Sequence, residues 1–134
     1  MILFVDDEEK RMDSYRLILE RELEPVCFFN NVDKAMDYFQ KEISSIKLLI
    51  LDIMMPPGDA FKDENTEEGL RTGLNFYDRV RSKTSNLPII IFTNVTEENV
   101  EDHFKADPKC RFLKKSDVFI FELVEEAKKL LNPN

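Results

Sequence analysis

The sequence predicts an α/β domain in which a parallel sheet carries helices on both faces. Short apolar runs alternate along the chain with longer segments whose apolar residues recur at helical spacing. Such an alternation is typical of successive βα units, which build a parallel sheet. The 134 residues are enough for one full core, and no internal repeat or low-complexity tract divides them. We therefore expect a single domain over residues 1–134.

Five apolar runs are short enough to be strands. The run Leu48–Leu51 is continuously apolar, which is typical of a strand buried on both faces. Pro88 stands at the beginning of the fourth run, where its missing N–H group is tolerated. In chain order we expect strands at residues 2–6, 26–29, 47–53, 87–93 and 111–115.

The segments that follow these runs carry apolar residues three and four positions apart, which predicts helices with one buried face. Ala35 and Phe39 share a face in the second segment, and Leu123, Ala127 and Leu130 do so in the last. In chain order we expect helices at residues 8–22, 32–43, 70–81, 97–105 and 117–131.

Composition excludes several classes of function. Apolar residues make up 43% and charged residues 34% of the chain, as in a soluble globular domain. The net charge of −8 and the lack of a long basic stretch argue against direct binding of nucleic acid. No apolar run approaches transmembrane length, and no secretory signal opens the chain. Cys27 and Cys110 are expected to be free thiols, so we expect a cytoplasmic protein without membrane contact.

Charged residues follow three of the expected strands directly. Asp6 and Asp7 follow the first strand, Asp52 ends the third, and Lys114 and Lys115 end the fifth. Because open α/β sheets bind ligands at the carboxyl ends of their strands, we expect these side chains to converge. Clustered carboxylates bind hard divalent cations, and a neighbouring lysine binds phosphate. Burying a carboxylate within the strand is costly, so we expect Asp52 to emerge at the strand's carboxyl end.

These motifs resemble those of response-regulator receiver domains of two-component signalling, over essentially the whole chain. Members of that family open with a hydrophobic strand that ends in two acids, as at Asp6-Asp7. Their phosphoacceptor aspartate precedes a Met-Pro pair, as Asp52 precedes Met55-Pro56. Their fourth strand ends in Thr or Ser, as at Thr93, and their fifth carries an aromatic residue, a leucine and a lysine, as in Phe112–Lys115. The four motifs in this order carry the resemblance.

The resemblance implies a flavodoxin-like, doubly wound sheet of five parallel strands in the order 2-1-3-4-5, with five helices. In that order the second and fifth strands lie at opposite edges of the sheet. Cys27 and Cys110 would then be too far apart for a disulfide bond, which agrees with the expectation of free thiols.

The resemblance also implies a Mg²⁺ site. Asp7 would ligate the ion directly, Asp6 would help through a water molecule, and Asp52 and the backbone carbonyl of Met54 would complete the protein ligands. Mg²⁺ suits such a sparse set because it commonly keeps several waters. An alternative role for Asp6 and Asp7 is to cap the first helix, and this role is compatible with metal binding.

The remaining roles concern the phosphoryl group. Asp52 would be the phosphoacceptor, and Lys115 would pair with Asp52 at rest and with the phosphoryl oxygens afterwards. Thr93 would donate a hydrogen bond to the phosphoryl group and so pull its loop inward. Phe112 would report this movement of the loop by changing rotamer. A simple core position is the alternative for Phe112.

Three features depart from the family pattern. Ser116 stands where a proline commonly follows the lysine, and Asn94 stands where the residue is usually very small. A connection rich in acids occupies residues 57–72 before Gly73, which is much longer than an ordinary βα loop. This acidic insertion is either functional or a tolerated surface insertion.

Three function classes remain to be compared. The first is a phosphorylation-dependent switch that receives its phosphoryl group from a histidine kinase or phosphotransfer protein and acts on a downstream protein partner. The second is a receiver-like adaptor that works without phosphorylation. The third, a haloacid-dehalogenase-type phosphatase, needs a second aspartate two positions after the nucleophile, where this chain has Met54. The sequence therefore favours a signalling protein over an enzyme that acts on other substrates.

Overall fold

The computed structural model describes residues 1–59, 69, 71–95 and 100–133, and all five expected strands lie within them. The strands are parallel and form one sheet in the order β2-β1-β3-β4-β5. Their bounds are Ile2–Val5 (β1), Val26–Phe29 (β2), Leu48–Leu51 (β3), Ile89–Thr93 (β4) and Cys110–Lys114 (β5). The predicted fold class and strand order are confirmed.

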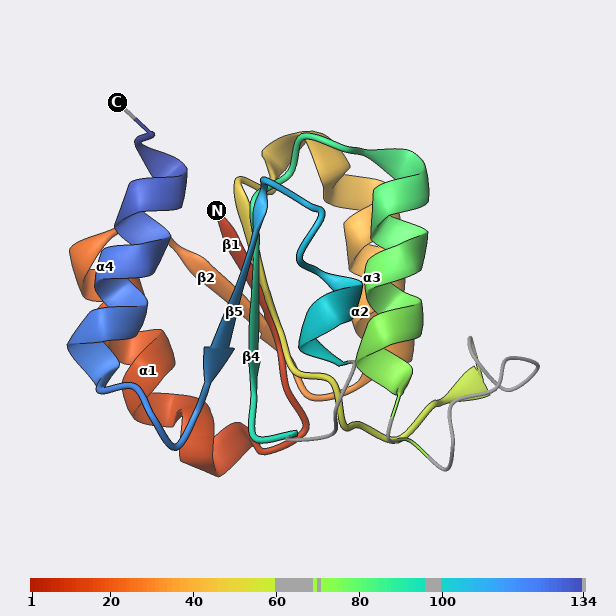
Figure 1. Ribbon diagram of the computed structural model, residues 1–134, viewed down its shortest axis with the longest axis horizontal. Coiled ribbons are helices and arrows are strands. Elements are labelled where there is room, and N and C mark those ends of the chain that lie inside the picture. Colours follow the sequence, from red (N-terminus) through yellow and green to blue (C-terminus); the bar gives the residue numbers. More distant parts are fainter. Residues whose placement is uncertain (60–68, 70, 96–99, 134) are drawn as a thin grey trace.

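Helices cover both faces of this sheet (Figure 1). Helices α1 (Glu9–Glu22) and α4 (Ile120–Leu131) lie on one face, and α2 (Val32–Glu42) and α3 (Thr72–Lys83) lie on the other. A short 3₁₀-helix, η1 (Ile43–Ser45), follows α2.

Alternate residues of the inner strands point to opposite faces of the sheet and pack into two separate hydrophobic cores. Leu3 and Val5 of β1 pack toward α2 and α3, whereas Ile2 and Phe4 pack toward α1 and α4. All four side chains are fully buried. Burial on both faces explains why these runs are continuously apolar rather than alternating.

The expectation of five helices is wrong for the part of the chain that the structure describes, which holds four α-helices. The segment expected to be a helix at 97–105 contains only a 3₁₀-helix, η3 (Glu101–His103), although 96–99 lie outside the described residues. Val100 and Phe104 are the buried apolar residues in the described part of this segment, enough to hold one turn against the core.

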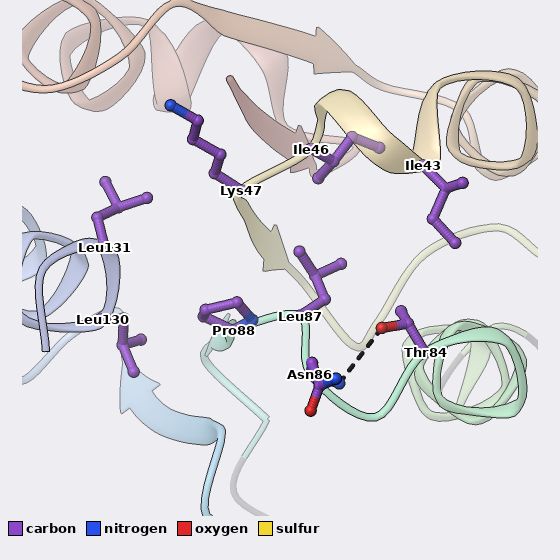
Figure 2. Close-up of a pocket in the computed structure, with 9 residues that line it drawn as sticks. All are labelled: Ile43, Ile46, Lys47, Thr84, Asn86, Leu87, Pro88, Leu130 and Leu131. Carbon is purple, nitrogen blue, oxygen red and sulfur yellow. Dashed lines mark hydrogen bonds between the residues drawn. The ribbon is translucent and has the colours of Figure 1, made fainter.

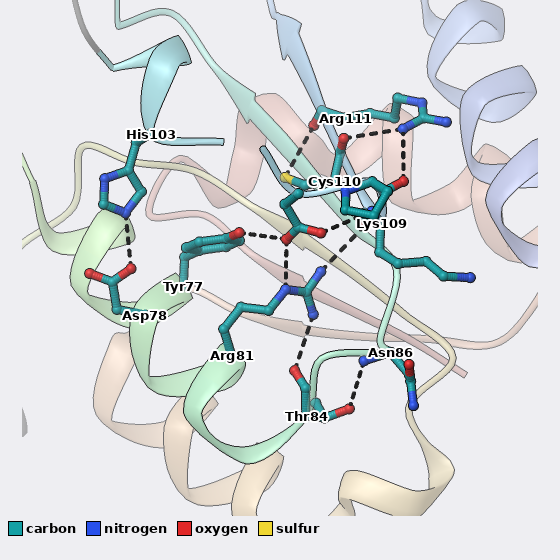
Figure 3. A network of polar contacts seen from close by, with 11 residues as sticks. Tyr77, Asp78, Arg81, Thr84, Asn86, His103, Lys109, Cys110 and Arg111 are labelled. Carbon is teal, nitrogen blue, oxygen red and sulfur yellow. Dashed lines mark hydrogen bonds and ion pairs between the residues drawn. The ribbon is translucent and has the colours of Figure 1, made fainter. Parts of the chain in front are cut away.

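Side chains of α3 hold this short crossover in place instead. Asp107 accepts hydrogen bonds from the Tyr77 hydroxyl and from Arg81 Nε, the latter at 2.7 Å. Figure 3 shows Tyr77 and Arg81 turned toward the loop that carries Lys109. Burial alone would raise the pKa of Asp107, but these hydrogen bonds outweigh it and lower the pKa. The crossover is therefore fixed to α3 by a charged network.

The two ends of the sheet differ in chemistry. An apolar pocket of about 350 Å³ lies at the end where β3 and β4 begin, lined by Ile46, Leu87 and Leu131 among others (Figure 2). The acids singled out in the sequence lie beyond the opposite, carboxyl ends of the strands.

Two further expectations concern the cysteines and the membrane. Cys27 and Cys110 are free thiols on the two edge strands, as predicted. Among the described residues, no helix combines the length and the apolar character needed to cross a membrane.

Candidate functional site

Two acids lie side by side at the carboxyl end of the sheet. Val5 and Leu51 are register partners on β1 and β3, and Asp6 and Asp52 each follow directly. The backbone N–H of Asp52 donates to the carbonyl of Val5 at 3.0 Å, which keeps the carboxyl ends of the two strands adjacent. Asp6 is 0% and Asp52 only 4% exposed. Asp52 therefore stands at the carboxyl end of its strand, as expected, but its side chain is buried there.

Lys115 makes this burial tolerable. Its Nζ lies 2.7 Å from Asp6 Oδ2 and 3.2 Å from Asp52 Oδ2. Only 8% of the lysine side chain is exposed, so the three charges form a buried cluster. Charges taken out of water are stable only when they are paired, and here one cation faces two carboxylates. Lys115 and not Lys114 makes these contacts, as predicted from the family spacing.

The charged groups of this cluster shift one another's pKa values. Burial, and then the charge of Asp52, raise the pKa of Asp6 to about 6. The same two causes, in the same order, raise the pKa of Asp7. Burial alone would lower the pKa of Lys115, but the carboxylates of Asp52 and Asp6 outweigh it and raise the pKa. At both acids, burial together with the charge of Asp52 outweighs the attraction of the lysine.

The donor atoms suit a hard divalent cation. Asp6 Oδ2 is buried and lies 2.7 Å from Lys115 Nζ, and no other described residue donates to it, so a lone pair stays available beside this ion pair. One carboxylate oxygen each from Asp6, Glu8 and Asp52 can be chosen so that all three lie within 4.8 Å of one another. Carboxylate oxygens at such spacing are the ligands that Mg²⁺ prefers.

Glu8 is a residue that the sequence reasoning left without a role. Its Oε1 lies 3.4 Å from Lys115 Nζ, whereas Asp7 is exposed and does not belong to this group of three acids. The run Asp6-Asp7-Glu8 could have indicated a role for Glu8, because this third consecutive acid lies where the chain turns into α1. The backbone N–H of Glu8 donates to Asp6 Oδ1 at 2.9 Å. Asp6 therefore supports the turn into α1 as well as pairing with Lys115.

Gly73 brings the beginning of α3 against the backbone of the site. Its N–H donates to the carbonyl of Ile53 at 2.7 Å. A Cβ atom at this position would lie 2.2 Å from the carbonyl oxygen of Asp52, so a larger residue would force the two segments apart. The Asp52 side chain is held in turn by the N–H of Ile53, which donates to Oδ1 at 2.8 Å.

Thr93 lies at the end of β4, beside Lys115 and Ser116, which follow β5. The threonine is fully buried, and its Oγ1 accepts a hydrogen bond from the N–H of Val95 at 3.3 Å. The N–H of Lys115 donates to the Thr93 carbonyl at 2.8 Å. One residue further, the N–H of Ser116 donates to Asn94 Oδ1 at 2.9 Å. The two sequence departures, Asn94 and Ser116, therefore contact each other, which no single motif indicated.

The other predicted residues lie at the margin of the site. Phe112 is partly buried, packs against the core and stacks on Phe104 with ring centroids 6.1 Å apart. The side chain of Met54 is 55% exposed. Most of the acidic insertion at 57–72 lies outside the described residues.

Comparisons with known proteins agree with this arrangement. The response regulator receiver domain family matches residues 2–118 of the chain. Among solved structures, a CheY-like response regulator receiver domain protein from Methanospirillum hungatei JF-1 is 21% identical with a TM-score of 0.78, over 98% of this chain and 93% of that chain. The receiver domain of a Francisella response regulator is 20% identical with a TM-score of 0.76, over 98% and 96%.

The receiver domain of the hybrid histidine kinase CckA is also similar, at 21% identity and a TM-score of 0.71, with 98% of both chains covered. No curated protein matches the chain. The structural likenesses show the shared fold, and the family match covers most of the sequence. The chain therefore belongs to the response regulator receiver domains, the signalling modules of two-component systems.

Proposed function

We propose that the protein is a phosphorylation-dependent switch whose phosphoacceptor is Asp52. The observation that carries this proposal is the buried cluster in which Lys115 Nζ lies within 3.2 Å of both Asp52 and Asp6. A carboxylate held beside a fixed ammonium group and other hard donors suits phosphoryl transfer, which needs placement and charge neutralisation more than covalent chemistry.

In the transfer, a carboxylate oxygen of Asp52 attacks phosphorus and forms an acyl phosphate. The bond from phosphorus to the donor breaks, its electron pair stays on the donor, and the donor takes up a proton from solvent. Lys115 then pairs with the phosphoryl oxygens, because its partner Asp52 no longer carries a full charge. The buried Thr93 hydroxyl donates to the phosphoryl group, which draws the end of β4 toward Asp52. Phe112 changes rotamer as the end of β4 moves.

Mg²⁺ is the cofactor of this proposal, and it supplies neutralisation of the phosphoryl charge when bound. Asp7 and Asp52 would hold it with the Met54 carbonyl, and Asp6 would act through water. The raised pKa values of Asp6 and Asp7 support this assignment, because both groups favour a nearby cation. Glu8 is a further donor at the same place.

The partners follow from the family. A histidine kinase or a phosphotransfer protein would supply the phosphoryl group, and a downstream protein would read the phosphorylated surface, in the cytoplasm. The net charge of −8 makes direct contact with nucleic acid unfavourable.

Incubation with Mg²⁺ and a small acyl phosphate, followed by intact mass measurement, tests the switch. We expect one added phosphate with Mg²⁺ and none with excess chelator. An adaptor that works without phosphorylation would gain no mass under either condition and would overturn the proposal. A phosphatase would consume the donor in many turnovers without a lasting gain of mass on the protein, which also contradicts the proposal.

Mg²⁺ should raise the melting temperature near neutral pH and have little effect well below pH 6. The folded pKa of Asp6, about 6, lies above its ordinary value, so ionisation of Asp6 disfavours folding above pH 6. The metal-free protein should therefore gain stability as the pH falls through 6. Mg²⁺ relieves the same repulsion by mass action while the acids are ionised. Thermal unfolding in chelator and in Mg²⁺ at several pH values measures both effects.

Two variants identify the ligands in that experiment. Asp7→Ala should lose the stabilisation by Mg²⁺ at neutral pH, whereas Asp37→Ala, which removes an exposed acid on α2, should keep it. Equal stabilisation of Asp7→Ala and wild type would place the cation elsewhere. In that case Glu8→Ala would be the next variant to test, because Glu8 belongs to the group of three acids.

A further inference from the structure

One hydrogen bond joins the loop after β4 to the loop after β5. The N–H of Ser116 donates to Asn94 Oδ1 at 2.9 Å, one residue beyond the backbone bond from Lys115 to the Thr93 carbonyl at 2.8 Å. We refer to the bond between Asn94 and Ser116 as the clasp. It extends the ladder between β4 and β5, with a side-chain oxygen in place of a backbone carbonyl.

The clasp needs both residue types. Position 116 must supply a backbone N–H, which any residue except proline has. Position 94 must supply an acceptor on a side chain long enough to reach the neighbouring loop, which alanine and glycine lack. Ser116 contributes its backbone and not its hydroxyl to this bond.

The clasp connects the two residues that act on the phosphoryl group. Thr93 directly precedes Asn94, and Lys115 directly precedes Ser116. Lys115 is held by carboxylate oxygens of Asp6, Asp52 and Glu8 at 2.7, 3.2 and 3.4 Å. The clasp therefore attaches the residue after Thr93 to the backbone next to Lys115, whose side chain is held by three carboxylates.

The order of the strands gives this attachment a direction. β4 lies between β3, which leads into Asp52, and β5, which leads into Ser116. Any movement of Thr93 toward a phosphoryl group on Asp52 takes Asn94 away from Ser116. The hydroxyl of Thr93 also accepts from the N–H of Val95 within its own loop. Movement toward Asp52 thus works against contacts made in the unphosphorylated protein.

We propose that the clasp holds Thr93 and Asn94, where β4 ends, in their resting position and so opposes the conversion to the phosphorylated form. The inference rests on the proposed function, because it assigns Thr93 to the phosphoryl group. Asn94 and Ser116 are positioning residues here: they act through Thr93 and touch no reacting atom.

Three variants separate the clasp from other effects of these positions. Asn94→Ala removes the acceptor, and Ser116→Pro removes the donor. Ser116→Ala is the matched control, since it removes the hydroxyl and keeps the N–H. The combination of Asn94→Ala with Ser116→Pro breaks a bond that each single change has already broken, so its effect should not exceed either one.

The first measurement needs no phosphate. Protection of the amide at position 116, its exchange rate compared with the intrinsic rate of the same residue in an unfolded chain, should fall in Asn94→Ala and stay unchanged in Ser116→Ala. Equal exchange in wild type and Asn94→Ala would overturn the clasp itself, whatever the fate of the phosphorylation proposal.

The second measurement is the dissociation constant of beryllofluoride, a stable analogue of a phosphoryl group on a carboxylate, in the presence of Mg²⁺. Net hydrogen-bond contributions to stability predict about fivefold tighter binding in Asn94→Ala and Ser116→Pro, or about 1 kcal/mol at 1.4 kcal/mol per tenfold. Ser116→Ala should match wild type. A merely structural bond would lower the melting temperature and leave this constant unchanged, which would overturn the proposal. If wild type itself bound no beryllofluoride, the proposed function would fail first, and the exchange result would still stand.

Discussion

Replacing Asp52 with asparagine is expected to abolish phosphate uptake while the fold is kept. An amide is not a nucleophile toward phosphorus, so no acyl phosphate can form. The amide oxygen can still accept the N–H of Ile53, which donates to Asp52 Oδ1 at 2.8 Å. Lys115 would keep its contact with Asp6 at 2.7 Å, so no buried charge loses its last partner. Intact mass after incubation with a small acyl phosphate and Mg²⁺ measures the uptake, and thermal unfolding checks the fold.

Asp37→Asn is the matched control for this change. The same chemical replacement is made at an exposed acid of α2 that pairs only with Lys41 among the described residues. This variant should take up one phosphate like wild type. Equal labelling of Asp52→Asn and Asp37→Asn would mean that Asp52 is not the acceptor.

Replacing Lys115 with alanine is expected to lower the free energy of unfolding by about 3–5 kcal/mol, the usual cost of breaking a buried ion pair from one side. Asp6 and Asp52 would be left buried with no cation beside them, at 0% and 4% exposure. Lys114→Ala, at the end of the same strand, should change stability by about 0.5 kcal/mol or less, because Lys115 and not Lys114 contacts the acids. Urea unfolding in chelator measures both variants.

A second change should rescue part of this loss. In Lys115→Ala combined with Asp6→Asn, one of the two orphaned charges is gone, so the double variant should be more stable than Lys115→Ala alone. The two changes share a contact and are not expected to add. A double variant less stable than the single one would show that Lys115 stabilises the fold through packing rather than through charge.

The sequence predicted the parts of the site that depend on strand ends. Asp6, Asp52, Thr93 and Lys115 each follow or end an apolar run, and parallel pairing then brings such ends to one edge. Neither the residue type nor its position along the strand required knowledge of tertiary contacts. The family pattern was needed to single out Thr93 and to choose Lys115 over Lys114.

Features that depend on tertiary contacts could not be predicted in this way. Asp52 stands at the strand end as expected, but the burial of its side chain could not be predicted, because an isolated buried carboxylate is costly and its partner Lys115 lies 63 residues away in the sequence. In the described part of the segment expected as a helix at 97–105 there is a short 3₁₀-helix, and Asp107 just beyond it binds Tyr77 and Arg81 of another helix. Such partners have no signature in the local pattern.

The contact between Asn94 and Ser116 belongs to the same class. Each residue was noted as a departure from the family pattern, and each was considered alone. Their hydrogen bond spans 22 residues and depends on the register of β4 and β5, in which Thr93 pairs with Lys114. A pattern that treats positions independently cannot indicate such a pair.

Chemical trapping of the phosphorylated side chain tests the central claim most directly. Borohydride delivers hydride to the carbonyl carbon of an acyl phosphate, phosphate leaves, and further reduction turns an aspartate side chain into that of homoserine. Peptide mapping after treatment with acyl phosphate and Mg²⁺ should find homoserine at position 52, and none in a sample kept in chelator. Modification at another acid of the cluster, such as Asp6, Asp7 or Glu8, or no modification of a protein that has gained phosphate, would contradict the assignment of Asp52 as the phosphoacceptor.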